Sequence, residues 1–273
     1  MTADIRRNAK RIVFFSALAT SLIGGFATAQ TGSLAVVEQI GTGNETVTTQ
    51  TGSANRAEIT IAGNNNTGLD VVQSGDGAIA EVAVTGDGNS FNVRQSGTGS
   101  NIAVGEVRGD GNTLFVDQIN AESDAYRNFA SVTQDGAGHM ATINQTAAAF
   151  DAAGVNSATL TQDGAGHIGT ITQTGTQNSA TFNQFGENNE GAIFQDGAGH
   201  SVELVQDGAG LDALEIRQSD CAVAGGCPTL RVEQTAGATI FGGGAAPGGI
   251  VTPGGTAVVT QGGTVIVGGG AGS

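Results

Sequence analysis

The sequence predicts an all-β protein, a two-sheet β-solenoid of strand–turn units of about 11 residues, 22 per coil, with a Gly-rich C-terminal tail. Three observations predict this fold. Glutamine recurs every 11 residues, polar and apolar residues alternate between the glutamines, and the composition combines 46 glycines with only 4% aromatic and 13% charged residues. Many short strands joined by glycine turns fit this composition better than a globular enzyme does.

Residues 1–29 have the pattern of a secretory signal peptide. A basic head that ends at Arg11 precedes the apolar stretch Ile12–Phe26, and Ala27-Thr28-Ala29 fits a cleavage site. The stretch is too short and wrongly flanked for a transmembrane anchor, which is the alternative. We therefore expect a secreted protein with no transmembrane segment in its mature chain, either released or held at the cell surface by other means.

The rest of the chain is strongly acidic. Residues 1–29 carry four of the ten basic residues and one of the 25 acidic ones, so a net charge of about −18 remains on residues 30–273. Such a chain has little with which to neutralise phosphate groups. Nucleic acid is therefore excluded as a partner.

An internal repeat occupies residues 30–236. Glutamines 162, 173, 184, 195 and 206 form an unbroken run at a spacing of 11. Where neighbouring glutamines are 22 or 23 apart, an apolar residue stands near the midpoint: Ile61, Val84 or Val107. The consensus is Q-x-G-x-x-N-x-A-x-x-x-Q. A fixed period over most of the chain indicates a repeat architecture.

Within each unit the pattern has a period of two, which is typical of a strand with one buried face. Asn156, Ala158, Leu160 and Gln162 share one face, and Ser157, Thr159 and Thr161 share the other. Asp-Gly pairs such as Asp163-Gly164 supply the turns. The buried face thus carries amides, which are costly to bury unless they are paired. Stacking identical units at about 4.8 Å would pair each amide with its copies above and below.

The pattern predicts a structural amide ladder. Its expected members are Gln39, Asn44, Gln50, Asn55, Asn89, Gln95, Asn112, Gln118, Asn128, Gln134, Gln145, Asn156, Gln162, Gln173, Asn178, Gln184, Asn189, Gln195, Gln206, Gln218 and Gln234. Three insertions, Ile119–Tyr126, Thr146–Val155 and Ser219–Pro228, all fall in even-numbered units. We therefore expect them to leave the solenoid from one edge.

The repeat unit resembles the curlin repeat, the building block of curli subunits, which form bacterial extracellular amyloid fibres. The resemblance covers roughly residues 39–234, with the best matches at 134–145 and 162–206. It implies a flat two-sheet solenoid that adds end to end into a pilus-like surface fibre and acts in cell adhesion, aggregation and biofilm matrix. It also implies self-association, a nucleator or second subunit, and an outer-membrane export system. Gln173, Asn178 and Gln184 match the inward amide ladder of that family.

This chain departs from the family pattern in three ways. It has more repeats, some of its units lack the glutamine, and its Gly-rich tail at residues 237–273 has no counterpart there. The tail contains Pro247 and Pro253, which indicate a linker, followed by two short apolar runs. These runs form a further strand pair or attach to a surface, and the sequence does not decide between the two. The choice between a major subunit and a nucleator is also left open.

Three histidines, His139, His167 and His200, stand where the repeat has asparagine, each at the end of Gln-Asp-Gly-Ala-Gly-His. An imidazole can take an amide's place in a hydrogen-bond ladder, and the alternative is a metal site at His139 and His167, one coil apart. Aspartates recur in the turns at positions 135, 163, 196 and 207. They fit ordinary Asp-Gly turns, with weak calcium binding as the alternative.

Catalysis has no support in the sequence. The chain contains no G-x-S-x-G elbow, phosphate loop, H-E-x-x-H or CxxC motif, and we expect neither an enzyme nor a cofactor. Cys221 and Cys227 are the only cysteines, and outside the cell we expect them to form a disulfide that closes a small loop. Besides a fibre subunit, the sequence allows a monomeric surface-binding solenoid, ice-binding or adhesin-like, suggested by outward threonines such as Thr159 and Thr161.

Overall fold

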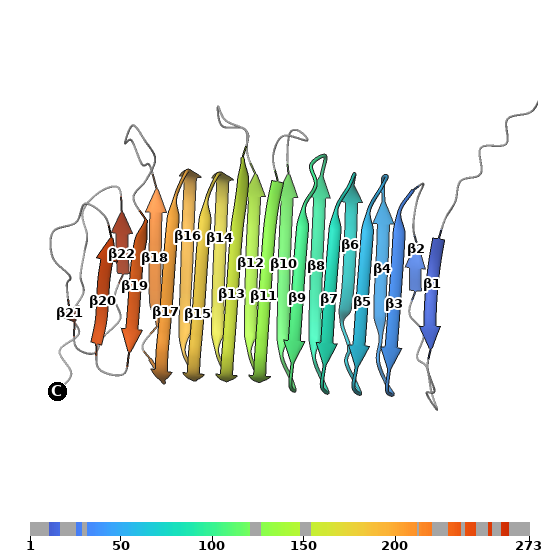
Figure 1. Ribbon diagram of the computed structural model, residues 1–273, viewed down its shortest axis with the longest axis horizontal. Helices are drawn as coiled ribbons and strands as arrows, with labels where there is room; N and C mark the ends of the chain where they lie inside the picture. Colours follow the sequence, from blue (N-terminus) through green and yellow to red (C-terminus); the bar gives the residue numbers. More distant parts are fainter. Residues whose placement is uncertain are drawn as a thin grey trace, which may run out of the picture.

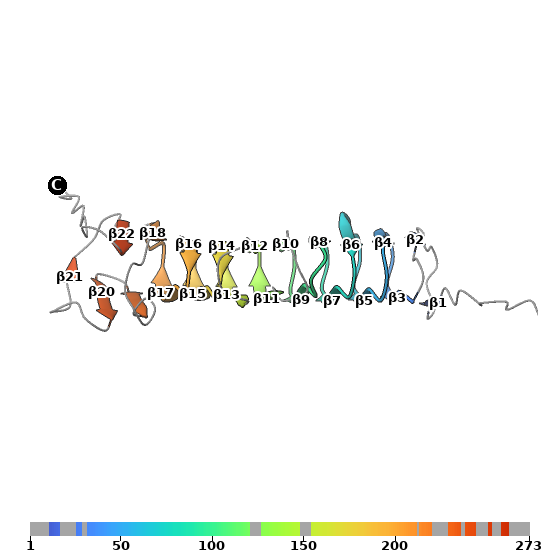
Figure 2. The ribbon, with the colours of Figure 1, turned by 90° about the horizontal axis from the view of Figure 1, so that it is seen from above.

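A computed structural model of the chain describes residues 11–16, 26–28, 32–120, 127–147, 154–211, 213–219, 229–235, 238–243, 251–252 and 258–261. Within these ranges the regular secondary structure is all β, and none of the residues is in a helix. Figure 1 shows the strands side by side along the long axis of the molecule, and the view from above in Figure 2 shows that they lie in two layers. The predicted all-β class is confirmed.

From β1 to β19 successive strands alternate between the two sheets. The twelve-stranded sheet contains, in order, β1 (Arg11–Ser16), β3 (Leu34–Ile40), β5 (Arg56–Ala62), β7 (Ile79–Thr85), β9 (Ile102–Arg108), β11 (Arg127–Ala137), β13 (Val155–Ala165), β15 (Ser179–Glu187), β17 (Ser201–Ala209), β19 (Leu230–Thr235), β20 (Ala238–Gly243) and β21 (Val251–Thr252). The ten-stranded sheet contains β2 (Phe26–Thr28), β4 (Thr46–Thr51), β6 (Leu69–Gly75), β8 (Ser90–Gly97), β10 (Thr113–Asn120), β12 (Met140–Ala147), β14 (Ile168–Thr176), β16 (Glu190–Ala198), β18 (Leu214–Ser219) and β22 (Val258–Gln261).

From β3 to β19 each strand pairs in parallel with the strand one coil away, two strands along the chain. The register sets equal repeat positions opposite each other, as Gln162 opposite Gln184 and Leu160 opposite Phe182. Ile61, Val84 and Val107 follow Gln39 in one such column, and glutamines resume in it at Gln134. The two-sheet β-solenoid with two units per coil is therefore confirmed, and the apolar midpoints occupy glutamine positions.

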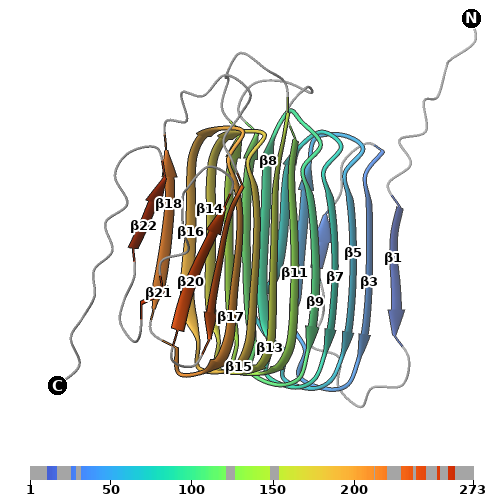
Figure 3. The same ribbon diagram turned by 60° about the vertical axis from the view of Figure 1, so that its left-hand side comes forward.

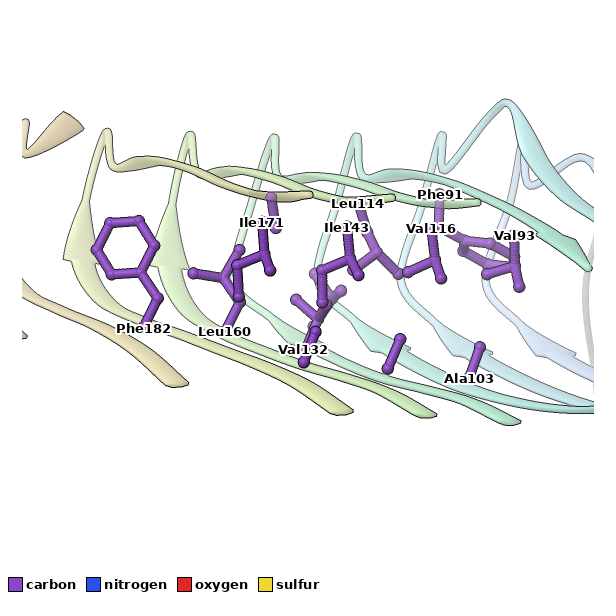
Figure 4. Close-up of a cluster of buried hydrophobic side chains, with 14 of the residues drawn as sticks. Phe91, Val93, Ala103, Leu114, Val116, Val132, Ile143, Leu160, Ile171 and Phe182 are labelled. Carbon is purple, nitrogen blue, oxygen red and sulfur yellow. The ribbon is translucent and has the colours of Figure 1, made fainter. Parts of the chain in front are cut away.

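The core is a single layer of inward side chains between the sheets. Leu160, Ile171 and Phe182 have no solvent-exposed surface, and Figure 4 shows them among the side chains that meet between the two layers. Glycines make room for the larger members of this layer. A Cβ built on Gly191 would lie 2.6 Å from the Cζ of Phe182, so the ring occupies the space that a side chain would need.

Glycine at the turns lets neighbouring coils come close together. Gly164 has a φ of +127°, and a Cβ there would lie 1.8 Å from the carbonyl oxygen of Gly186 in the next coil. A residue with a side chain would meet both backbone strain and a direct clash. This explains why most units of the repeat keep a glycine two residues after the glutamine.

The three insertions begin within the ends of β10, β12 and β18, which extend to Asn120, Ala147 and Ser219 and all belong to the ten-stranded sheet. They therefore leave the solenoid at the same edge, as their parity predicts. Cys221 and Cys227 lie in the last insertion, outside the described residues, so their disulfide stays a prediction.

Both ends of the solenoid carry additional strands, visible in Figure 3. At the N-terminal end, β1 pairs with β3 and β2 pairs with β4, both in parallel. At the other end β20 pairs antiparallel with β19, β21 pairs antiparallel with β20, and β22 pairs in parallel with β18. No helix in the described ranges is long and apolar enough to cross a membrane.

Candidate functional site

A column of buried glutamines runs along the inner face of the ten-stranded sheet. The Nε2 of each glutamine donates to the Oε1 of the glutamine one coil further on, at 2.7–2.9 Å. Its members are Gln50, Gln73, Gln95, Gln118, Gln145, Gln173, Gln195 and Gln218. The column is continuous, so each interior amide has a like partner on both sides.

The twelve-stranded sheet carries a shorter column of the same kind. Gln134, Gln162, Gln184, Gln206 and Gln234 are joined by the same Nε2-to-Oε1 bonds at 2.8–2.9 Å. On the N-terminal side of Gln134 the next three positions of this column are apolar: Val107, Val84 and Ile61. Beyond them Gln39 donates to the hydroxyl of Thr46 instead of to a glutamine.

The second hydrogen of each amide ties the two sheets together. Gln173 Nε2 also donates to the carbonyl oxygen of Ser157 at 2.9 Å, across the core at the start of β13. Gln184 Nε2 likewise donates to the carbonyl of Ile168 at 3.0 Å, at the start of β14. One glutamine thus binds its neighbouring coil and the facing sheet at once, which satisfies both of its hydrogens.

The glutamine-to-glutamine bonds of both columns all run in one direction: each Nε2 donates to the glutamine of the next coil toward the C-terminus. In such a column the Oε1 atom of the first glutamine receives no hydrogen bond from another glutamine. The Oε1 atoms of Gln50 and Gln134, the first members of the two columns, are buried and have no hydrogen-bond partner in the described part of the chain. A buried polar atom without a partner is costly and calls for an explanation.

Asparagines form two further columns at the turns. Asn89 shows the pattern: its Oδ1 accepts the backbone N–H of Asn112 one coil on, and its Nδ2 donates to the carbonyl of Gly109, each at 2.8 Å. One column contains Asn44, Asn66, Asn89, Asn112 and Asn189, and the other contains Asn55, Asn101, Asn128, Asn156 and Asn178. These amides therefore hold the turns of successive coils together.

His139 and His167 make two of the bonds that the asparagines of their column make. Like Asn112 and Asn189, each accepts a backbone N–H of the next coil and binds the carbonyl oxygen four residues before it. His139 Nδ1 accepts the backbone N–H of His167 at 3.3 Å, and His167 Nδ1 accepts that of Asn189 at 3.2 Å. Their Nε2 atoms lie 3.2 and 3.1 Å from the carbonyl oxygens of Asp135 and Asp163. Because a carbonyl only accepts, Nε2 carries the proton and Nδ1 has the free lone pair. The network thus requires the neutral ring.

The two rings stack on each other, with centroids 5.1 Å apart and planes 6° from parallel. Burial lowers the pKa of both His139 and His167, and the neighbouring His167 lowers that of His139 further. His200 Nε2 similarly lies 2.9 Å from the carbonyl oxygen of Asp196. In His139 and His167 both ring nitrogens are engaged in hydrogen bonds to the backbone, which explains their presence without a metal.

The structure gives the metal alternatives no converging set of ligands. Among the described residues there is no group of three or more His, Cys, Asp or Glu side chains placed to hold an ion. Asp135 and Asp163 are register partners and point outward, but the next position in their column is Phe185. Asp196 and Asp207 are likewise exposed in their turns.

The outward threonines form short runs. Ser131, Thr159 and Thr181 follow one another in register on the twelve-stranded sheet, and Glu203 ends the run. On the other sheet Thr170 is followed by Ala192. A regular threonine surface along the whole solenoid is therefore not formed by these residues.

The structure places every residue of the expected ladder in the interior, each no more than 5% exposed. Three buried amides of the columns were not among those expected: Asn66, Gln73 and Asn101. Gln73 and Asn66 lie on the repeat and could have been found from it. Asn101 lies six residues after Gln95 instead of five, so one additional turn residue hides it from the pattern.

Comparison with known families matches part of the repeat. Residues 156–186 match the family model described as curlin associated repeat. These residues run from Asn156 in β13 to Gly186 near the end of β15, so the match covers a region where both glutamine columns are continuous. No curated protein and no solved structure matches the chain.

Proposed function

From the premise that the chain is a member of the curlin-repeat family, we propose that it is a secreted structural subunit that stacks end to end into amyloid-type fibres. These fibres act in cell adhesion, aggregation and biofilm matrix at the cell surface. Export through the outer membrane and a nucleator or second subunit are part of the same proposal. The role is structural, without catalysis or a cofactor.

The observation that carries the proposal is the unserved acceptor of Gln50. Its Oε1 is buried in the first coil of the longest glutamine column and has no donor in the described part of the chain. Every other member of that column accepts the Nε2–H of the glutamine before it. A second copy stacked on this end would supply a glutamine at the same place, at the same rung spacing.

The backbone supports the same arrangement. Removal of residues 1–29 takes away β1 and β2, and with them the strands that pair with β3 and β4. The mature chain then presents two parallel strand edges at one end. Open edges of this kind template the addition of another chain unless they are capped or charged. Glu38 is the only charged residue of these two strands.

Assembly of purified residues 30–273 tests the proposal. We expect polymerisation after a lag, with thioflavin binding and a cross-β reflection near 4.7–4.8 Å. Added salt should shorten the lag, because it screens repulsion between chains of net charge about −18. Fragments of finished fibres should remove the lag, because they provide ready edges.

A matched control separates stacking from nonspecific aggregation. Fragments of an unrelated amyloid should not shorten the lag, since their side chains do not continue the amide columns. A chain that stays monomeric for days at tens of micromolar, with salt and with its own fragments, contradicts the fibre subunit. Thermal hysteresis of ice in that monomeric sample would then support the surface-binding alternative.

A further inference from the structure

We propose that strands β20, β21 and β22, here called the tail cap, close the C-terminal end of the solenoid and must be displaced before a second copy can dock there. This inference rests on the proposed end-to-end stacking. It assigns the Gly-rich tail a role as a removable cover of a self-association surface.

The first argument is the direction of β20. From β3 to β19 the twelve-stranded sheet is parallel, and the pairing of β17 with β19 still sets Gln206 opposite Gln234. β20 then runs antiparallel to β19 and sets Thr239 opposite Gln234 and Gly243 opposite Leu230. No glutamine of β20 meets the column, because this strand has none. The edge that would continue the repeat is therefore occupied by a strand that cannot continue it.

The second argument is that the other sheet is covered at the same end. β22 pairs in parallel with β18, with Val259 opposite Ile216 and Gln261 opposite Gln218. This short strand takes one rung on the ten-stranded sheet, at the backbone positions that a docking copy would use. Both sheet edges at the C-terminal end are thus paired within the chain (Figure 3).

Docking requires both edges together. In each coil the strands of the two sheets are joined by a turn, so β3 and β4 of an arriving copy must pair with the two sheets at once. β3 would continue the column after Gln234, and β4 would continue the column after Gln218. With β20 and β22 in place neither position is open, and the antiparallel β20 gives β3 no matching register.

The third argument is chemical. Residues 236–273 contain no charged side chain, whereas the rest of the mature chain carries all of its net charge of about −18. A docking edge is blunted in other proteins by charge, bulges or a covering segment. Here the cover is neutral and built from short strands: β21 pairs with only two residues of β20. Such a cover protects the edge and can be exchanged for the longer, matched strands of a second copy.

The test compares the mature chain, residues 30–273, with its Ile240→Pro variant. Ile240 pairs with Glu233 of β19 and with Val251 of β21, and proline removes its N–H from the middle of the cap. Gly270→Pro, beyond the last described strand, is the matched control. A second variant ends at residue 235 and lacks the cap altogether. None of the three changes alters the charge.

We expect the Ile240→Pro and truncated chains to show severalfold shorter lags and severalfold faster elongation on a fixed amount of fibre fragments. Elongation is included because each arriving copy must open its own cap. Gly270→Pro should behave as the parent chain. A peptide of residues 236–273 added to the truncated chain should slow it again.

The outcomes separate this inference from the proposed function. If all variants polymerise at the parent rate, the cap is refuted and the fibre subunit stands. If the Ile240→Pro and truncated chains polymerise more slowly, the tail is part of the docking surface and the cap is also refuted. If no variant polymerises with its own fragments, the proposed function itself fails.

Discussion

Replacing the stacked histidines by asparagine should remove an acid sensitivity that the structure builds into the solenoid. The change is His139→Asn with His167→Asn. Both positions lie in a column whose other members, Asn112 and Asn189 among them, accept the N–H of the next coil and donate to the carbonyl four residues earlier through an amide. Asparagine does not titrate, so the variant keeps the bonds at every pH, whereas the histidines keep them only while neutral.

The sign follows from the lowered pKa values of His139 and His167. Below the unfolded-state pKa of about 6.5, the unfolded chain binds protons that the folded chain resists. Stability is therefore complete above that pH and falls as the solution becomes more acidic. A protonated Nδ1 would also face the backbone N–H of the next coil, so that two donors oppose each other.

Linkage sets an upper bound on the effect. For each ring that stays neutral in the fold, the free energy of unfolding falls by about 1.4 kcal/mol for each pH unit below 6.5. At pH 5.5 the two rings together account for up to about 2.8 kcal/mol. The relevant assay is urea unfolding of freshly prepared monomer between pH 7.5 and 5.5, with the parent chain and the variant compared at each pH.

We expect the parent to lose stability over this range and the variant to lose clearly less, with similar values for both at pH 7.5. His200 is unchanged in both chains, so a difference between their pH slopes comes from His139 and His167. Equal pH slopes in the two chains would refute the neutral-ring assignment. A variant that is much less stable at pH 7.5 would show that asparagine does not replace the two bonds.

Two further predictions concern the columns and the turns. Gln184→Leu should destabilise the fold by about 2–6 kcal/mol, because it deprives Gln162 Nε2 of an acceptor and Gln206 Oε1 of a donor at about 1–3 kcal/mol per orphaned group; Gln162→Leu acts in the same way. Assembly of both variants should slow well beyond that of the outward Thr159→Val and Thr181→Val, and equal effects would disprove the inward role. Gly164→Ala should cost more stability than Gly138→Ala in thermal unfolding, because both have positive φ but only the first Cβ meets a backbone oxygen. A difference within error would mean that the coils separate easily.

The period predicts most of this architecture, because equal residues at equal spacing must meet when coils stack. Gln162 and Gln184 are 22 residues apart and therefore share a column, and the inward place of Leu160 follows from its distance to them. The three insertions all fall in even-numbered units, which predicts their common edge for the same reason. These features depend on counting, which the sequence supplies directly.

Other features depend on atomic contacts that the spacing of residues in the sequence does not determine. The direction of the amide bonds is one, since a column of glutamines can donate either way and the pattern is the same. The antiparallel pairing of β20 is another, because Ala238–Gly243 has neither the repeat glutamine nor its spacing. The tautomer of His139 likewise follows only from its partners, the carbonyl of Asp135 and the N–H of His167.

The two buried acceptors without a donor, Gln50 Oε1 and Gln134 Oε1, differ in whether a second copy can reach them. Gln134 Oε1 lies inside the solenoid beside Val107, where no second copy can reach it, so its cost is part of the fold. Gln50 Oε1 lies in the first coil, and the proposed removal of residues 1–29 opens the preceding rung. A donor for it has to come from the C-terminal end of another copy, because the glutamine-to-glutamine bonds of both columns are donated toward that end. The stack we propose is therefore polar, with Gln218 and Gln234 of one copy facing Gln50 and Gln39 of the next.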